Sequence, residues 1–238
     1  MKAFLLAAGH GTRLKPLTDT TPKCLIPIRG TPMLQIWIEQ CRRYGIREIL
    51  VNIHAHADLV HAYLRKSAPA DLRVQISEEP ELLGSAGTLR ANRDWIASDQ
   101  LFWVFYSDVL TDADLGRMLE FHRQKRQLAT LGVYAVSDPR RCGIVDVDGA
   151  NIIQSFVEKP ERPAGNLAFS GLMVAHPSVL DAIPDGVPRD IGFHLLPRLA
   201  GNMAAHQITG YLLDIGTMEN YKVAQDTWPG LDGLSARC

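Results

Sequence analysis

The sequence predicts an α/β fold in which a mixed, mostly parallel sheet is flanked by helices. In the first half of the chain, short unbroken apolar runs alternate with amphipathic stretches, which is the pattern of β-α-β units. After residue 128, strand-like runs follow one another and are separated by turn signals. This second pattern favours antiparallel pairing, so we expect the two halves of the chain to differ in strand direction.

The elements of the first half follow from hydrophobic periodicity. Buried strands are expected where apolar residues run without a break, at 4–8, 48–53 and 101–106. Helices are expected where apolar residues recur every three or four positions, at 33–44, 59–66 and 114–125. Because parallel strands need crossover connections, these helices should cover both faces of the sheet.

The second half is divided by the turn signals Asp138-Pro139, Asp148-Gly149 and Lys159-Pro160. Four strands are expected between and around these turns, at 128–136, 143–147, 152–157 and 167–174. Two late helices are expected at 191–200 and 218–225. The chain shows neither an internal repeat nor a low-complexity linker, so we expect one domain over residues 1–238.

Composition excludes several classes of protein. The 238 residues are 46% hydrophobic and 21% charged, an ordinary globular balance. A net charge of -1 lacks the basic excess of nucleic-acid binders, so no nucleic-acid partner is expected. The chain contains neither an apolar run long enough to span a membrane nor an export signal, which predicts a cytoplasmic protein with no membrane partner. The cysteines are widely scattered and are expected to be free thiols: Cys24, Cys41, Cys142 and Cys238.

A glycine-rich loop, Leu6-Ala7-Ala8-Gly9-His10-Gly11-Thr12-Arg13, follows the first expected strand. Its small residues let backbone N–H groups approach an anion. Leu14 replaces the third glycine of a dinucleotide-binding motif, and the G-K-[ST] of a P-loop is missing. Instead Arg13 is joined by Lys23, with prolines at positions 16, 22 and 27 that restrict the backbone. Fixed cations beside such a loop suit a triphosphate.

Further motifs recur in order along the chain. After the loop come Pro16-Leu17-Thr18, Pro22-Lys23, Glu79-Pro80, Gly84-Ser85-Ala86-Gly87-Thr88-Leu89, Ser107-Asp108, Glu158-Lys159-Pro160, Phe169-Ser170-Gly171 and Asp214-Ile215-Gly216-Thr217. This ordered series resembles the signature of the sugar-1-phosphate nucleotidyltransferases, also called nucleoside-diphosphate-sugar pyrophosphorylases. The resemblance covers nearly the whole chain.

The resemblance implies an enzyme that transfers a nucleoside monophosphate from a nucleoside triphosphate to a sugar 1-phosphate, releasing pyrophosphate. It also implies a Rossmann-like core of the glycosyltransferase-A-like kind with a small antiparallel sugar-binding subdomain. On this reading the single domain has a nucleotide-binding half at 1–127 and a sugar-phosphate-binding half at 128–238. Such a transfer depends on positioning and on neutralising charge, and it needs no protein nucleophile.

The resemblance also assigns residues to roles. Arg13 would hold the triphosphate, and Lys23 would stabilise charge as pyrophosphate leaves. Asp108 and Asp214 would hold Mg²⁺ through oxygen ligands. The nucleotide would contact Leu6, Ala7, Ala8, Gly9, Gly11, Thr12, Gly84, Gly87 and Thr88. The sugar phosphate would contact Gly143, Glu158, Lys159 and Ser170.

The substrates are narrowed but not fixed by this resemblance. The motifs most resemble guanylyltransferases, which pair GTP with mannose 1-phosphate or manno-heptose 1-phosphate. Uridylyl transfer to N-acetylmuramic acid 1-phosphate and thymidylyl transfer to glucose 1-phosphate stay open. Two departures bear on this choice, because Ser107 stands where glycine is common and Cys24 where proline is common.

The chain ends soon after Trp228, which predicts a stand-alone catalytic domain without a C-terminal β-helix. Association into a homo-oligomer is expected from the habits of many relatives.

Two other classes of protein are alternatives for this sequence. The segment His54-Ala55-His56-Ala57-Asp58, with His61 nearby, contains the H-x-H-x-D pattern of a zinc hydrolase. Leu59 stands where the next ligand histidine belongs, which disfavours that reading. A non-catalytic regulatory subunit that binds a nucleotide sugar is the other alternative, and the presence of Lys23 and both aspartates disfavours it.

Overall fold

The computed structural model describes residues 1–231, which form two compact units. The amino-terminal unit contains Lys2–Glu81, Phe105–Ala113 and the chain from Gly210 on. The central unit contains Leu82–Val104 and Asp114–Thr209, together with Met1. Each unit is therefore built from separate stretches of sequence. The predicted halves at 1–127 and 128–238 divide the chain by substrate rather than by compactness, and they stay a proposal.

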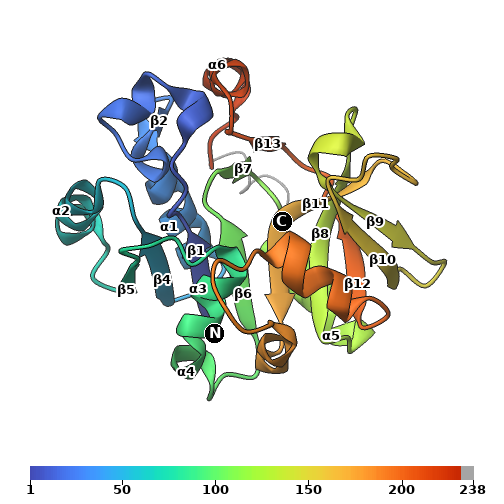
Figure 1. The fold of residues 1–238 in the computed structure, drawn as a ribbon. Helices are drawn as coiled ribbons and strands as arrows, with labels where there is room; N and C mark the ends of the chain where they lie inside the picture. Colours follow the sequence, from blue (N-terminus) through green and yellow to red (C-terminus); the bar gives the residue numbers. More distant parts are fainter. Residues whose placement is uncertain (232–238) are drawn as a thin grey trace. The chain divides into compact units, whose positions relative to one another are not determined.

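Parallel strands form the sheet of the amino-terminal unit (Figure 1). β4 (Glu48–Ile53) lies between β1 (Lys2–Leu6) and β5 (Arg73–Glu78) and is parallel to both. The crossovers are α1 (Met33–Arg43) and α2 (Ala57–Ser67), which confirms the expected β-α-β units. β1 ends at Leu6, two residues before the predicted end of the first strand.

Two short antiparallel pairs complete this unit. β2 (Pro27–Ile28) pairs with β3 (Thr31–Pro32), and β7 (Val109–Thr111) pairs with β13 (Leu212–Asp214). The second pair places Asp214 opposite Val109, the residue after Asp108. The last helix, α6 (Met218–Thr227), contributes to an apolar cluster with α1, made of Ile28, Met33, Ile36, Leu110, Ile215, Ala224 and Trp228. Residues 110 and 215 are thus held together by buried apolar surface.

Trp37 is the largest fully buried side chain of α1. Its ring stacks on Phe105 with 4.6 Å between ring centroids. Its indole Nε1 donates a hydrogen bond of 3.0 Å to the Val109 carbonyl. Trp37 therefore fixes α1 on the chain segment that carries Asp108.

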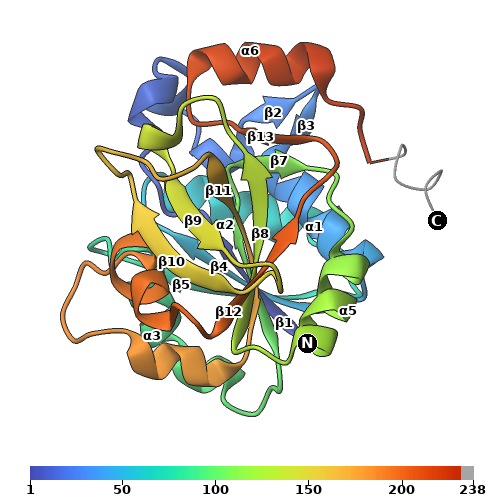
Figure 2. The ribbon, with the colours of Figure 1, turned by 90° about the vertical axis from the view of Figure 1, so that its right-hand side faces the viewer.

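The central unit is mostly antiparallel (Figure 2). Its five strands are β8 (Ala129–Ala135), β9 (Gly143–Val147), β10 (Ile153–Glu158), β11 (Leu167–Ala175) and β12 (Met203–Gln207). β11 is antiparallel to β8 and β9, and β10 is antiparallel to β9, as predicted. β12 was not predicted, and it is parallel to β8. β6 (Phe102–Tyr106) passes from the central unit into the amino-terminal unit after Val104.

The helices of the central unit are α3 (Ser85–Ala91), α4 (Arg93–Ile96) and α5 (Leu115–Lys125). The predicted helix at 191–200 is wrong. A π-helical turn, η6 (Ile191–Leu195), is followed by a 3₁₀ turn, η7 (Leu196–Leu199). Pro197 has no N–H to continue an α-helix, and the Asp190 carboxylate accepts the N–H groups of Gly192 and Phe193. With these corrections the chain has the predicted α/β fold, a mixed sheet flanked by helices.

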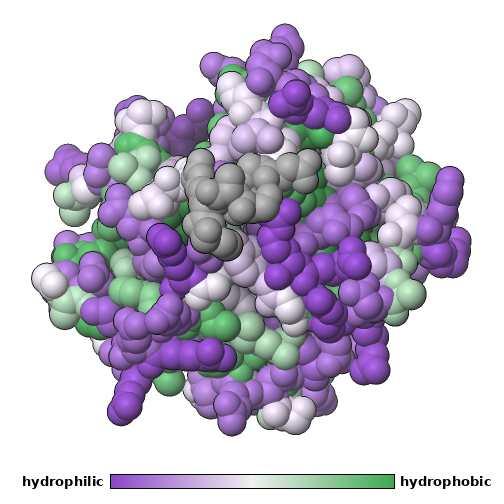
Figure 3. All heavy atoms as spheres, turned by 180° about the vertical axis from the view of Figure 1, so that it is seen from behind, coloured by the Kyte–Doolittle hydropathy of each residue, from purple (hydrophilic) through white to green (hydrophobic). Residues whose placement is uncertain are grey.

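The surface is mainly hydrophilic on the face shown in Figure 3. Large apolar side chains that are exposed are scattered along the described chain, at Met1, Leu59, Leu128, Val157, Val187, Phe193 and Val223. Among the described helices, none is long and apolar enough to cross a lipid bilayer.

Three of the cysteines predicted to be thiols form no disulfide in the described part of the chain: Cys24, Cys41 and Cys142. Burial raises the pKa of the Cys24 thiol to about 12, so Cys24 packs as an inert apolar residue. Cys238 lies outside the described residues.

Replacing Trp37 with Phe should lower the free energy of unfolding by about 1–3 kcal/mol, because the buried Val109 carbonyl loses its donor. Urea denaturation followed by circular dichroism measures the change. Trp95→Phe, at a partly exposed tryptophan in α4, is the matched control and should have a smaller effect. Equal effects of the two substitutions would contradict the role given to Trp37.

Candidate active site

The glycine-rich loop is fixed at its start by a buried polar chain. The Ala7 N–H donates to Asn52 Oδ1 at 2.7 Å, and Asn52 Nδ2 donates to Glu79 Oε1 at 2.9 Å. Asn52 and Glu79 are only 4% and 2% exposed. Asn52 lies at the carboxyl end of β4, beside Leu6 in the register. Sequence reasoning missed Asn52, although a lone amide in an otherwise apolar strand was a usable signal.

Ser107 fixes the same loop from the other side. Its Oγ and its backbone N–H both donate to the Leu6 carbonyl, at 2.8 and 3.1 Å, and the residue is 3% exposed. The departure from glycine noted at this position therefore adds a side-chain bond to the strand that carries the loop. It removes no charge from the site.

Within the loop, Gly11 has a structural reason to be glycine. Its φ is +64°, and a Cβ there would lie 2.7 Å from Thr18 Cγ2. Thr18 Oγ1 donates to the Gly11 carbonyl at 2.9 Å, and the Leu14 N–H donates to it at 2.8 Å. At Gly9, by contrast, an added Cβ would meet no atom within 4 Å. The loop is thus held tightly at Gly11 and is open at Gly9, where Thr12 and Arg13 are also exposed.

Four predicted residues of the amino-terminal unit come together. Lys23 Nζ lies 2.5 Å from Asp108 Oδ2, and these side chains are 13% and 30% exposed. The Ile215 N–H donates to the Asp108 carbonyl at 2.8 Å, which holds the end of β13 against Asp108. A Cβ on Gly216 would lie 2.6 Å from Asp214 Oδ1 and 2.9 Å from Arg13 Nη2. We call Arg13, Lys23, Asp108 and Asp214 the charged cluster.

Opposing electrostatic effects act on the Asp214 carboxyl group of the charged cluster. The pKa of Asp214 is raised, first because surrounding protein displaces water from its carboxyl group and second because Asp108 repels its negative charge. The positive charges of Lys23 and Arg13 act in the opposite direction. Two carboxylates meet here with two cations, so bringing the acids together depends on the bases.

The oxygen ligands of the charged cluster suit a divalent cation such as Mg²⁺, which prefers carboxylate, phosphate and water oxygens. Asp108 and Asp214 offer two carboxylates. No group of three histidine, cysteine or acidic residues that could hold a metal exists among residues 1–231. A cation held by these two aspartates would therefore complete its coordination with water or with ligand phosphates.

The segment at 84–89, in the central unit, consists of Gly84 and the first residues of α3, and it is shaped by contacts with residue 189. Gly84 has a φ of +76°, and a Cβ there would strike the Arg189 backbone. The N–H groups of Ala86 and Gly87 donate to the Arg189 carbonyl at 2.9 and 3.1 Å. Thr88 is fully buried, and its Oγ1 donates to the Gly84 carbonyl at 3.2 Å. The Thr88 hydroxyl thus bonds within this segment.

Glu158 is the last residue of β10 in the same unit, and Lys159 follows it. The Glu158 side chain is 16% exposed, and a Cβ on Gly143 would lie 2.6 Å from its Oε2. Burial raises the pKa of Glu158, and repulsion from Asp190 raises it further, while Lys159 opposes both. Lys159 has a left-handed backbone, with a φ of 49°, and its N–H donates to the Cys142 carbonyl at 3.0 Å. Strained residues of this kind cluster at functional sites.

Ser170 lies in β11, where the pairing with β8 is irregular between Phe169 and Met173. It is 3% exposed, and its Oγ accepts the Leu172 N–H at 3.3 Å. A Cβ on Gly132 would lie 2.5 Å from that Oγ. The structure thus groups Gly143 with Glu158 and Lys159, and it pairs Ser170 with Gly132.

The histidine-rich segment does not assemble a zinc site among the described residues. His54 Nδ1 lies 2.7 Å from the Glu79 carbonyl oxygen, and its ring meets that of His10 at 4.9 Å between centroids. His61 Nε2 lies 3.2 Å from Glu78 Oε2. These histidines contact neighbouring residues of the fold, so the zinc-hydrolase alternative gains nothing from the structure.

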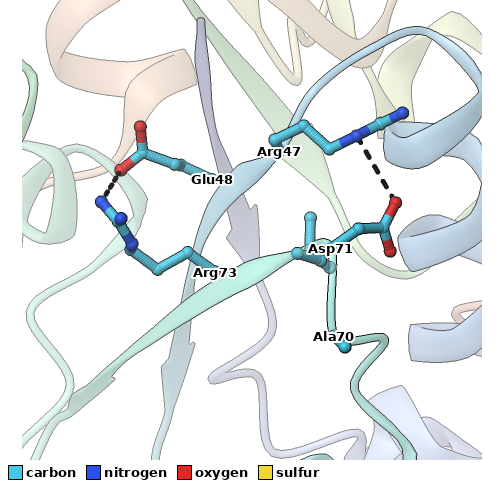
Figure 4. Close-up of a pocket in the computed structure, with 6 residues that line it drawn as sticks. Arg47, Glu48, Ala70, Asp71 and Arg73 are labelled. Atoms are coloured by element: carbon cyan, nitrogen blue, oxygen red, sulfur yellow. Dashed lines mark hydrogen bonds and ion pairs between the residues drawn. The ribbon is translucent and has the colours of Figure 1, made fainter.

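A surface pocket lies at the amino ends of β4 and β5, whereas Asn52, which holds the glycine-rich loop, lies at the carboxyl end of β4 (Figure 4). It is lined by Arg47, Glu48, Ala70, Asp71, Leu72 and Arg73. Its charged side chains pair with one another, Arg73 with Glu48 at 3.1 Å and Arg47 with Asp71 at 3.5 Å. Ligands of parallel sheets bind at the carboxyl ends of strands, and this pocket lies at the amino ends, so we assign no substrate to it.

An α/β fold with a glycine-rich loop after its first strand and a cluster of fixed cations and carboxylates is typical of proteins that bind phosphate groups. Residues 2–228 match the family model described as nucleotidyl transferase. The chain belongs to this family.

Relatives of known name agree with this placement. The chain is 33% identical over 227 residues to a probable mannose-1-phosphate guanylyltransferase 1 of Oryza sativa subsp. japonica, covering 93% of this chain and 63% of the relative. The mannose-1-phosphate guanylyltransferase 1 of Arabidopsis thaliana is similar to the same extent. The chain thus spans less than two thirds of the length of these relatives.

Among solved structures, HddC from Yersinia pseudotuberculosis in complex with GMP-PN matches with a TM-score of 0.80 and 26% identity. That match covers 95% of this chain and 99% of HddC. A Bacillus anthracis protein provisionally described as a glucose-1-phosphate thymidylyltransferase matches with a TM-score of 0.85. It is 23% identical over 95% of this chain and 94% of its own, so it supports the fold alone.

Replacing Asn52 with Ala should lower the free energy of unfolding by about 1–3 kcal/mol, because the Ala7 N–H and the buried Glu79 carboxylate each lose a partner. Chemical denaturation measures the change. Asn166→Ala, at an exposed asparagine, is the matched control and should be near neutral. A near-neutral Asn52→Ala would mean that the polar chain does not hold the loop.

Proposed function

We propose that the protein is a sugar-1-phosphate nucleotidyltransferase that transfers GMP from GTP to mannose 1-phosphate or manno-heptose 1-phosphate. The observation that carries this proposal is the charged cluster of Arg13, Lys23, Asp108 and Asp214 in the unit that holds the glycine-rich loop. The names of the rice and Arabidopsis relatives support the guanylyl and mannosyl choices. The GMP-PN complex of HddC supports the base.

In the proposed reaction, a phosphate oxygen of the sugar 1-phosphate attacks the α-phosphorus of the triphosphate. A new P–O bond forms at the α-phosphorus. The bond between the α-phosphorus and the oxygen that bridges it to the β-phosphorus breaks, and pyrophosphate leaves with the electron pair of that bond. Arg13 holds the triphosphate, and Lys23 neutralises the charge that develops on the leaving group. Fixed cations of this kind lower the barrier because they need no reorganisation during the reaction.

Asp108 and Asp214 are proposed to hold Mg²⁺ together with the phosphates. The bound cation supplies Lewis-acid neutralisation of the phosphoryl oxygens. Lys23 Nζ already pairs with Asp108 Oδ2, so Lys23 and the proposed Mg²⁺ would compete for the same carboxylate. Lys23 must leave Asp108, at least in part, when it turns toward the phosphates of the nucleotide. The ion pair therefore keeps Asp108 compensated until substrate arrives.

The remaining roles are assigned by the same proposal. Lys159 binds the phosphate of the sugar 1-phosphate, and Glu158 accepts hydrogen bonds from sugar hydroxyls, with Gly143 and Ser170 in the sugar pocket. The loop residues Leu6, Ala7, Ala8, Gly9, Gly11, Thr12, Gly84, Gly87 and Thr88 form the nucleotide site. The cytoplasmic location and the homo-oligomer stay predictions from the sequence.

Pyrophosphate release tests the proposed function directly. GTP, UTP, dTTP, CTP and ATP are each combined with Mg²⁺ and with 1-phosphates of mannose, manno-heptose, glucose and N-acetylated sugars. Release that requires both GTP and a manno-configured partner is the expected result. Release with UTP or dTTP instead would move the assignment to the corresponding amino-sugar or glucose phosphate. Folded protein that binds a nucleotide sugar but releases nothing would identify a regulatory subunit.

Lys23→Ala should reduce kcat by at least about 100-fold, because a fixed charge at the transferring phosphates is worth several kcal/mol. Steady-state pyrophosphate release with the best substrate pair measures the loss. Lys15→Ala, at an exposed lysine that pairs with Asp19 on the surface, is the matched control and should keep normal turnover. Near-normal turnover of Lys23→Ala would refute the catalytic role.

Asp108→Asn should raise the Mg²⁺ concentration needed for half-maximal activity, because the neutral amide is a weaker ligand than a carboxylate. A Mg²⁺ titration of the initial rate measures the shift. Asp226→Asn, at an exposed aspartate of α6, serves as the control. An unchanged Mg²⁺ dependence in Asp108→Asn would place the cation elsewhere.

A further inference from the structure

The segment at 189–195 of the central unit is hydrogen-bonded to the segment at 83–87, which includes the start of α3. The Arg189 N–H donates to the Leu83 carbonyl at 2.8 Å, and the Arg189 carbonyl accepts two N–H groups at the start of α3. Ser85 Oγ donates to Asp190 Oδ2 at 2.9 Å and accepts the Ile191 N–H at 2.8 Å. The Ser85 hydroxyl therefore uses both its donor and an acceptor on this segment.

Asp190 fixes the turn that follows it. Its second oxygen, Oδ1, accepts the Gly192 N–H at 2.8 Å and the Phe193 N–H at 3.2 Å. Its own N–H donates to His194 Nδ1 at 2.9 Å. One carboxylate thus bonds the Ser85 side chain through one oxygen and the π-helical turn through the other. π-helical turns are rare and are frequent at functional sites.

The same turn bounds the Glu158-Lys159 motif. A Cβ on Gly192 would lie 2.8 Å from Glu158 Cδ, so the Glu158 carboxyl group packs directly on the Gly192 backbone. Lys159 Nζ lies 5.7 Å from the centroid of the Phe193 ring, within the range of a cation–π contact. Residues 192 and 193, whose N–H groups Asp190 accepts, therefore both contact the motif.

We propose that Asp190 is a positioning residue that couples the segment at 84–89, assigned to the nucleotide site, to the Glu158-Lys159 motif, assigned to the sugar phosphate. A displacement of Ser85 moves Asp190, and Asp190 carries the turn that confines Glu158 and Lys159. Binding of nucleotide at the segment at 84–89 then favours the arrangement that binds the sugar phosphate, and the reverse holds by thermodynamic linkage. This inference rests on the proposed function, because it takes the two substrate assignments from it.

Ser85→Ala tests the coupling without touching the sugar motif. This substitution removes only the Ser85 hydroxyl group, so folding should be retained. Asp190→Ala would also leave two backbone N–H groups of the turn without their acceptor. We expect Ser85→Ala to raise the KM for the sugar 1-phosphate about 5-fold or more, the range of typical coupling between sites. Ser85→Thr keeps the hydroxyl and should restore the KM. Ser178→Ala, whose serine bonds locally to His176, is the matched control and should change nothing.

Hydrogen–deuterium exchange of the same variants gives a readout that needs no turnover. In Ser85→Ala the amides of residues 191–193 should exchange faster than in wild type, and those of Ser178→Ala should not. Unchanged exchange at this turn would overturn the link itself. Faster exchange with an unchanged KM for the sugar phosphate would overturn the coupling and leave a purely structural contact. Wild-type protein without pyrophosphate release would instead refute the proposed function, which is a separate outcome.

Discussion

The approach of two carboxylates, Asp108 and Asp214, is the constraint on which the rest of the site depends. Like charges repel, and the raised pKa of Asp214 reflects that repulsion together with the loss of water around it. The pairing of β7 with β13 and the apolar cluster under it hold the two aspartates in place. Lys23 and Arg13 supply the compensating charge. The close approach of Asp108 and Asp214 is therefore stabilised by the positive charges of Lys23 and Arg13.

The same constraint explains several residues that carry no charge. Gly216 must be glycine because a side chain there would meet both Asp214 and Arg13. Gly11 must be glycine because Thr18 closes over it, and Thr18 is in turn part of the segment that leads to Lys23. Asn52 and Ser107 hold Ala7 and Leu6 from neighbouring strands. The start of the loop is thus held by neighbouring strands, and Gly11 is held by Thr18.

Much of this arrangement could be predicted from the sequence, for identifiable reasons. Strands at 48–53 and 143–147 are unbroken apolar runs or lie between clear turn signals, and both were found at those bounds. The charged cluster was predicted from motifs, because Lys23 and Asp214 are far apart in sequence and periodicity says nothing about their meeting. β5 and β12 were missed, since β5 alternates polar with apolar residues and β12 is short and rich in alanine.

Other features depend on tertiary contacts that no local pattern reports. The helix expected at 191–200 is a π-helical turn because Asp190 accepts two of its N–H groups and Pro197 interrupts it. Nothing in the local sequence indicates that Ser85, about a hundred residues away, bonds the same carboxylate. The link between the two substrate motifs is therefore visible only in the folded chain.

The most direct test of the account concerns the carboxylate that Lys23 and a divalent cation are proposed to share. Mn²⁺ binding to the free protein, measured by electron paramagnetic resonance, can be compared in wild type, Lys23→Ala and the control Lys15→Ala. If Lys23 competes for Asp108, its removal frees the Asp108 carboxylate and leaves Arg13 as the remaining cation of the charged cluster, so Lys23→Ala should bind Mn²⁺ more tightly than wild type. Equal or weaker Mn²⁺ binding by Lys23→Ala would contradict the shared site on which the proposed mechanism rests.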